Sequence, residues 1–157
     1  MSFIELEGVT KYYKDTVRAL DGVSFTVGQG EWMAIMGPSG SGKTTLLNIL
    51  GCLDQPTSGR VRIGGSETAR MNRAELTRFR AEMVGFIFQQ FHLIPYLTAL
   101  ENVMMAQYFH SMTDEGEALE ALDRVGLKAR ARHLPSQLSG GEQQRVSIAR
   151  ALINQPK

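Results

Sequence analysis

The 157-residue sequence has little cysteine, little net charge and no long apolar run. Its single cysteine, Cys52, excludes an internal disulfide and a cysteine cluster for metal, and we expect it to be a small apolar filler at a helix end. A formal net charge of +1 is too small for nucleic-acid binding by phosphate neutralisation, so no nucleic-acid partner is expected. No window reaches the length of a membrane span, and the first residues lack a signal-peptide pattern. We therefore expect one cytoplasmic domain with no direct membrane insertion.

Alternating and continuous apolar runs predict the strands. Residues 3–9 and 23–27 alternate apolar with polar side chains, as half-buried strands do, and 60–63 does so over a shorter length. Two other runs, 32–36 and 84–88, are continuously apolar, which is typical of strands covered on both faces in a parallel sheet. The sequence therefore predicts an α/β protein.

Start and stop signals predict the helices. Asn72 with Glu75, and Thr98 with Glu101, have the spacing of capping boxes, and Gly126 has the position of a helix stop. The expected helices are one leaving the glycine loop over 43–52, those opened by the two capping boxes, one ending before Gly126, and a last one over about 142–154 with Val146, Ala149 and Ile153 on one face.

A glycine-rich loop lies between the predicted strand at 32–36 and the helix after it. Its residues are Gly37, Pro38, Ser39, Gly40, Ser41, Gly42, Lys43 and Thr44, which fit the pattern G-x-x-x-x-G-K-[ST]. Such a loop points backbone N–H groups at phosphate oxygens, and the helix dipole adds to that field. We expect Lys43 to reach the β- and γ-phosphates, Thr44 to hold Mg²⁺ and Thr45 to contact the next phosphate back. A glycine-rich turn without a ligand is the alternative, and the loop alone leaves kinases, GTPases and many ATPases open.

A second segment, LPSQLSGGEQQRVSIARAL at 134–152, predicts another anion site. Ser139, Gly140, Gly141 and Glu142 place a hydroxyl and two glycines at the start of the last predicted helix. One ATP does not need two such sites from one chain. The economical arrangement is two chains head to tail, each offering this loop to the γ-phosphate held by the other. A simple helix cap is the alternative interpretation.

These motifs, with FIFQQFHLIP, GCLDQPTSG and LTALENV, resemble the ATP-binding subunits of ABC transporters along the whole chain, and most closely the lipoprotein-release and macrolide-export branch. The resemblance implies an α/β P-loop NTPase core with an N-terminal antiparallel β region and a helical subdomain, the C-terminal part of the core being missing. It divides residues 1–157 into a β region and phosphate-loop core at 1–90, a helical subdomain at 91–139 and a signature helix at 140–157.

The same resemblance implies roles for single residues, with ATP and Mg²⁺ as cofactors. Tyr13 would stack on adenine, Lys43 would neutralise transition-state charge, and Gln89 would join Thr44 at the metal and link the attacking water to a membrane partner. The implied partners are a transmembrane permease subunit and a second copy or an equivalent nucleotide-binding subunit, on the cytoplasmic face of the inner (plasma) membrane. Glu142 stands where the best-known signature has glutamine, and Arg145, one turn along, is placed to offset its charge.

Phosphoryl transfer also requires a carboxylate behind Mg²⁺ and a group that positions water. In the family both lie downstream of this segment, and the nearest substitutes fail, because Asp54 continues the phosphate-loop helix and Asp123 lies in an amphipathic helix. We therefore expect the complete family protein to be an ATPase, and the 157-residue chain alone to be catalytically impaired or inactive. We also expect apolar faces to be exposed at 32–36 and 84–88. The alternatives are a truncated or regulatory nucleotide-binding module without turnover, and a soluble family member in translation or DNA repair, against which the single phosphate loop argues.

Overall fold

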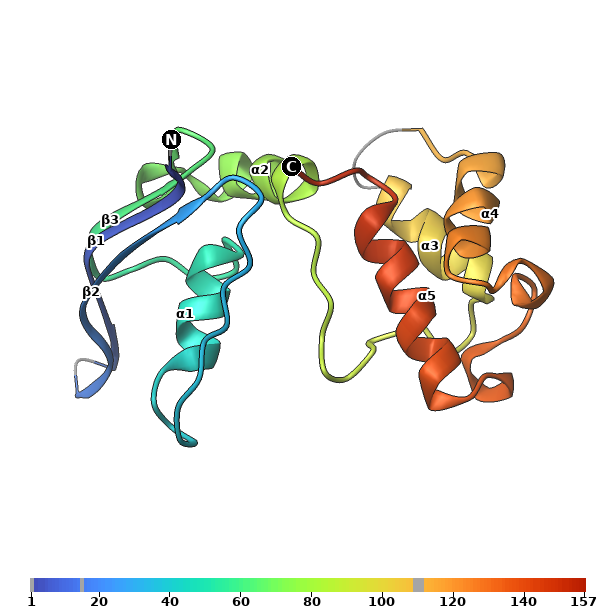
Figure 1. Ribbon diagram of the computed structural model, residues 1–157, viewed down its shortest axis with the longest axis horizontal. Helices are drawn as coiled ribbons and strands as arrows, with labels where there is room; N and C mark the ends of the chain where they lie inside the picture. Colours follow the sequence, from blue (N-terminus) through green and yellow to red (C-terminus); the bar gives the residue numbers. More distant parts are fainter. Residues whose placement is uncertain (1, 15, 109–111) are drawn as a thin grey trace. The chain divides into compact units, whose positions relative to one another are not determined.

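The computed structural model describes residues 2–14, 16–108 and 112–157. The chain divides into two compact units, Met1–Thr77 and Arg78–Lys157. In Figure 1 the first unit contains the blue strands and the cyan helix, and the second contains the yellow to red helices. The three-part division at residues 90 and 139 stays a prediction.

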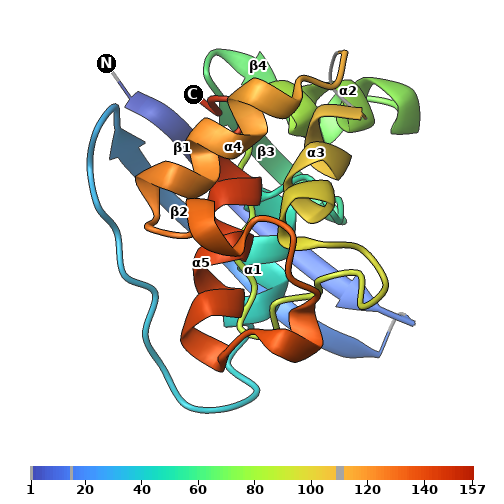
Figure 2. The ribbon, with the colours of Figure 1, turned by 90° about the vertical axis from the view of Figure 1, so that its right-hand side faces the viewer.

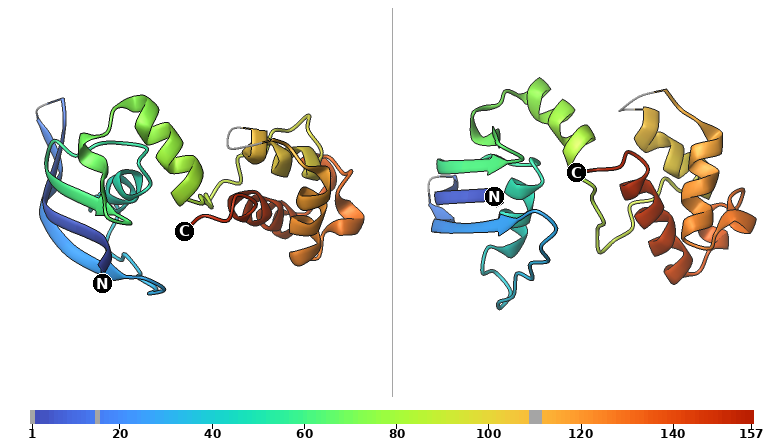
Figure 3. Two further views of the ribbon diagram at one scale, coloured as in Figure 1. Left: turned by 90° about the horizontal axis from the view of Figure 1, so that it is seen from above. Right: turned by 45° about the horizontal axis from the view of Figure 1, so that its top comes forward.

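The first unit is built on a four-stranded antiparallel sheet. Its strands are β1 (Ser2–Tyr13), β2 (Val17–Gly28), β3 (Ser58–Ile63) and β4 (Ser66–Glu67), in the order β2-β1-β3-β4. The strands predicted at 3–9, 23–27 and 60–63 are confirmed, and each is longer than predicted. Helix α1 (Lys43–Leu50) lies on one face of this sheet (Figure 3).

An irregularity in β1 keeps its apolar side chains on the buried face. Leu6 pairs with Phe25 of β2 and Val61 of β3, and the register shifts between Leu6 and Val9. Because side chains alternate along a strand, Leu6 and Val9 would face opposite sides without the shift. Gly8 lies within it at φ +58°, a conformation that glycine adopts readily. Leu6 and Val9 are consequently both buried.

Helix α1 buries one side and ends earlier than predicted. Leu46 and Ile49 are buried, and the helix ends at Leu50, followed by a turn through residue 52. Cys52 occupies that turn at φ +56° and is 2% exposed. Its predicted role as a small buried filler at a helix end is confirmed.

Both predicted capping boxes open helices. The N–H of Asn72 donates to the Glu75 carboxylate at 2.7 Å, and the N–H of Glu75 donates to the Asn72 side chain at 3.0 Å, at the start of α2 (Arg73–Met83). Thr98 and Glu101 make the same pair of bonds, at 2.7 and 3.2 Å, at the start of α3 (Ala99–Tyr108). Each box satisfies N–H groups that a helix start leaves unpaired. A short 3-10 turn, η1 (Thr68–Arg70), precedes α2.

The second unit packs three helices around one apolar core. Figure 2 shows the ribbons of these helices, labelled α3, α4 and α5. These are α3, α4 (Glu115–Arg124) and α5 (Gly140–Leu152), with the 3-10 turns η2 (Lys128–Arg130) and η3 (Pro135–Gln137) between α4 and α5. Gly126, at φ +72°, follows α4 as predicted. Within the described ranges, no helix has the length and apolar character needed to cross a bilayer. The buried core residues are Ala99, Leu100, Val103, Ala118, Leu122, Leu127, Ala131, Leu138, Val146 and Ala149.

The buried amide of Asn102 organises the loop before α3. It is 1% exposed, accepts a hydrogen bond from the N–H of Ile94 at 2.7 Å, and donates to the carbonyls of Ile94, Leu97 and Thr98 at 3.0–3.1 Å. A backbone segment without regular structure has no ladder or helix partners, so a side chain that bonds its N–H and C=O groups holds its shape. Residues 94–98 are therefore fixed by one side chain that the sequence analysis did not single out.

The predictions of buried strands at 32–36 and 84–88 are wrong. Both segments are irregular, and the sheet contains neither. Trp32 is fully exposed, Met36 is 88% exposed and Ile87 is 50% exposed. A continuous apolar run becomes a buried strand only where other strands pair with its edges, and in the described part of the chain no strand pairs with either run. The expectation that these segments expose apolar side chains is met.

Candidate functional site

Glycine conformation shapes the phosphate loop that leads into α1. Gly40 and Gly42 have φ of +80° and +85°, in the left-handed region that other residues rarely adopt. A Cβ on Gly42 would lie 2.4 Å from the carbonyl oxygen of Ala19 and 3.0 Å from Leu20 Cδ2, whereas a Cβ on Gly40 would meet nothing within 4 Å. Gly42 therefore lets the start of α1 approach β2 closely.

The ammonium of Lys43 lies over its own loop. It donates to the carbonyls of Gly37 and Pro38 at 2.8 and 2.7 Å and lies 3.3 Å from Ser41 Oγ. Backbone carbonyls are weaker partners for a cation than phosphate oxygens, so an entering phosphate can replace them. Thr44 and Thr45 follow in the first turn of α1, where N–H groups have no partner within the helix. These residues fit a phosphate group.

Tyr13, at the end of β1, contacts two charged side chains. Its hydroxyl donates to Asp54 at 2.8 Å, and the Lys11 ammonium lies 5.0 Å from the centre of its ring. Lys11 also pairs with Asp54 at 2.6 Å and donates to the Gln55 carbonyl at 2.7 Å. Partial burial alone would raise the pKa of Asp54, but hydrogen bonds from Lys11, Tyr13 and the Gln55 N–H outweigh it and lower that pKa.

The signature segment begins α5 with a capping box. Ser139 Oγ accepts from the N–H of Glu142 at 3.3 Å, and the Glu142 carboxylate accepts from the N–H of Ser139 at 2.8 Å. The bond from the Ser139 N–H lowers the pKa of Glu142 most, and the positive charges of Arg130 and Arg145 lower it further. Arg130 lies 3.6 Å from Glu142, so it is the nearer cation, which the sequence analysis did not single out. Gln143 ties the preceding loop to α5 through the carbonyls of Pro135 and Leu138, at 3.0 and 3.1 Å.

Gln89 is exposed and lies in an irregular segment. Hydrogen bonds from α5 hold the residues that follow it. The guanidinium of Arg150 donates to the carbonyls of Phe91 and His92, each at 2.8 Å. Burial lowers the pKa of Arg150, but an arginine remains charged at neutral pH. The segment carrying Gln89 is thus attached to the helix that begins at Ser139.

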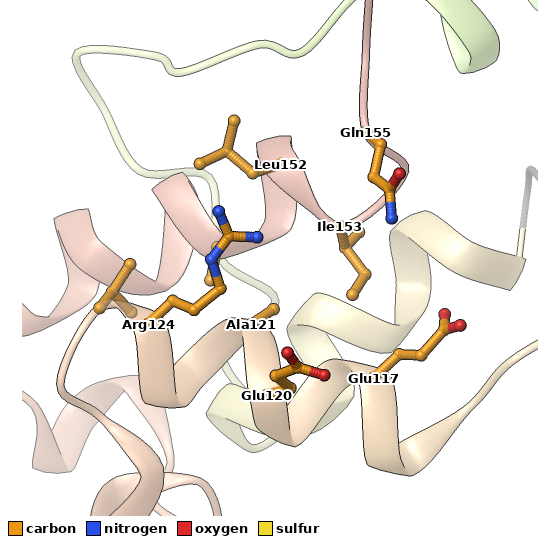
Figure 4. Close-up of a pocket in the computed structure, with 9 residues that line it drawn as sticks. Glu117, Glu120, Ala121, Arg124, Leu152, Ile153 and Gln155 are labelled. Atoms are coloured by element: carbon orange, nitrogen blue, oxygen red, sulfur yellow. The ribbon is translucent and has the colours of Figure 1, made fainter.

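The two units each carry part of the predicted site. The first unit contains Tyr13 and residues 37–45, and the second contains Gln89 and residues 139–142. A hollow of about 170 Å³ between α4 and α5, drawn in Figure 4, contains none of them. Across residues 2–14, 16–108 and 112–157, three His, Cys, Asp or Glu side chains nowhere gather closely enough to hold a metal ion. In the described part of the chain a carboxylate or histidine cluster therefore does not hold Mg²⁺, and the metal roles of Thr44 and Gln89, whose oxygens are neutral, stay predictions.

The sequence matches the ABC transporter family over residues 20–157. The chain belongs to this family. Relatives include the macrolide export ATP-binding/permease protein MacB of Chlorobaculum tepidum, with 50% identity over 98% of this chain and 24% of that protein. The lipoprotein-releasing system ATP-binding protein LolD of Bacteroides fragilis is also 50% identical, over 98% of this chain and 72% of that protein. The predicted resemblance to these two branches is confirmed.

A solved ABC cassette matches the structure as well as the sequence. The dimeric structure of the ATP-binding cassette MJ0796 bound to ADP and Pi has a TM-score of 0.88 and 49% identity, over 98% of this chain and 70% of that one. The predicted fold class, an ABC ATPase cassette of mixed α/β type, is confirmed. This chain thus spans about a quarter of the MacB protein and about 70% of the other two.

Proposed function

We propose that this ABC cassette binds MgATP and, within a complete transporter, hydrolyses it in a head-to-tail dimer to drive a transmembrane permease. The phosphates lie along residues 37–45, with Lys43 on the β- and γ-phosphates and Thr44 and Gln89 at the metal. Ser139 and Gly141 of each chain complete the site of the other. Mg²⁺ supplies charge neutralisation on the phosphate oxygens. The name of one relative, a macrolide export ATP-binding/permease protein, supports the permease partner. The proposed place of the cassette is the cytoplasmic face of the inner (plasma) membrane.

The geometry of Lys43 carries this proposal. Lys43 is the first residue of α1, and its ammonium is 2.7–2.8 Å from two carbonyls of the loop before the helix. A lysine held at the mouth of a helix N-terminus adds a positive charge to the N–H groups that bind phosphate. Tyr13, on the same unit, is 39% exposed and offers a ring for a nucleobase.

The test is binding of a fluorescent ATP analogue to the 157-residue chain with Mg²⁺, with phosphate release followed in the same samples. Lys43→Ala should abolish binding, whereas Lys14→Ala, an exposed lysine of the same unit, should not change it. Binding that persists in Lys43→Ala would refute the proposed phosphate site. Release that depends on Lys43 would identify a catalytic carboxylate within these residues.

A second candidate is a nucleotide-binding module without turnover of its own. Asp54 and Asp123, the two carboxylates weighed as substitutes from the sequence, are paired with Lys11 and Lys128, which favours binding over hydrolysis in this polypeptide. Lysine-dependent binding without phosphate release would support this candidate for the 157-residue chain. Restored release in a chain of the length of the LolD relative would assign turnover to the longer protein.

A further inference from the structure

We propose that Asp54 and Lys11 are positioning residues for nucleobase binding, because they hold the ring of Tyr13 in place before the nucleotide arrives. The proposal rests on the proposed function, in which Tyr13 stacks on the base of ATP. It adds the specific role of a lysine and an aspartate that act through the ring of Tyr13.

The contacts around Tyr13 fix both its tip and one face of its ring. The hydroxyl is bonded to Asp54 at 2.8 Å, and the Lys11 ammonium lies 5.0 Å from the ring centre. Lys11 is itself bonded to Asp54 at 2.6 Å, so the three side chains form a closed triangle. With a cation over one face, the nucleobase has the other face for stacking.

The triangle is connected by hydrogen bonds to the helix that follows the phosphate loop. The N–H groups of Leu53 and Asp54 donate to the carbonyl of Asn48 in α1, at 2.8 and 3.2 Å. The N–H of Tyr12 also donates to Thr57 Oγ1, at 3.0 Å. The ring of Tyr13 is therefore attached to the helix whose first turn lies in the phosphate site. An aromatic ring ordered in advance costs less entropy on binding than a mobile one.

The proposal predicts an effect on the base but not on the phosphates. Tyr13→Phe and Asp54→Ala should each raise the Kd of ATP about two- to tenfold, the entropy cost of ordering one side chain, and leave the Kd of inorganic tripolyphosphate unchanged. Tyr13→Ala should raise the Kd of ATP at least as much. Tyr12→Phe and Asp21→Ala are matched controls, because Tyr12 is 38% exposed on the same strand and Asp21 pairs with Arg18 at the surface.

The measurement is competition by ATP and by tripolyphosphate against a fluorescent ATP analogue, using the complete chain. If Tyr13→Ala weakens ATP binding while Tyr13→Phe and Asp54→Ala do not, the positioning role is wrong and base stacking stands. If Tyr13→Ala has no effect on ATP, the proposed base site itself is wrong. If Asp54→Ala raises the Kd of ATP and of tripolyphosphate together, Asp54 supports the phosphate loop rather than the ring, which also overturns the proposal.

Discussion

Replacing Gly42 by alanine should destabilise the chain far more than replacing Gly40. Both glycines have φ near +80°, where an alanine costs about 1–2 kcal/mol. The reduced freedom of the unfolded chain offsets about 0.4–1 kcal/mol of that cost at either position. Only at Gly42 does the new Cβ meet neighbours, with the Ala19 carbonyl oxygen at 2.4 Å and Leu20 Cδ2 at 3.0 Å. Forcing an atom into such a space costs about a further 1–3 kcal/mol.

The assay is urea unfolding followed by circular dichroism, alongside binding of a fluorescent ATP analogue. We expect the free energy of unfolding to fall by about 2–4 kcal/mol in Gly42→Ala, from strain and contact together, and by about 1 kcal/mol or less in Gly40→Ala. Gly30→Ala, at φ +77° with nothing within 4 Å, is the control outside the phosphate loop and should behave like Gly40→Ala. Equal losses at Gly42 and Gly40 would refute the argument, since the Ala19 contact would then have no energetic effect.

Three further predictions concern the second unit. Asn102→Ala should lower the free energy of unfolding by about 2–4 kcal/mol, because the part-buried Ile94 N–H and Leu97 carbonyl lose their partner. Asn154→Ala, with one bond to the Ala106 carbonyl, should cost about 1 kcal/mol, and similar losses in urea unfolding would contradict this. Leu122→Ala should lower the free energy of unfolding by about 2–5 kcal/mol, and Leu152→Ala, whose side chain is 48% exposed, should lower it much less. A small loss in Leu122→Ala would mean that the helical core is not packed as described. The pKa of Glu142 is lowered in the folded chain, so its contribution to the free energy of unfolding is complete above the ordinary value of 4.5 and is lost as the pH falls through the lower folded value. Glu142→Gln should therefore flatten the plot of unfolding free energy against pH in that acid range. An unchanged plot would count against the capping box.

Short-range signals in the sequence predicted structure well. The capping boxes at Asn72 and Thr98 join residues three positions apart, so the sequence alone contains both partners. The helix stop at Gly126 and the glycines of the phosphate loop depend on backbone conformations that a single residue decides. These features could be predicted because no distant partner is needed.

Long-range partners could not be predicted in the same way. Asp54 lies 41 residues from Tyr13, and Arg150 lies 58 residues from His92, so no spacing rule connects them. The apolar runs at 32–36 and 84–88 show the opposite error, because their composition indicates a buried strand without saying whether neighbouring strands are present. The apolar pattern shows that a segment can form a buried strand, and the presence of neighbouring strands decides whether it does.

The two proposed anion sites differ in what already occupies the helix start. α1 begins after Gly42, which has no side chain to cap the helix, so its first N–H groups are open to a phosphate. α5 begins after its N-cap Ser139, whose hydroxyl and N–H are both bonded to Glu142. A hydroxyl that accepts the capping bond can still donate its own proton, so Ser139 can bind a phosphate oxygen without releasing the helix. The carboxylate of Glu142 adds negative charge there, and Arg130 at 3.6 Å reduces it. The first site is therefore suited to hold a phosphate by itself, whereas the second offers the Ser139 hydroxyl and the first N–H groups of α5 to a phosphate that, in the proposed dimer, the partner chain holds.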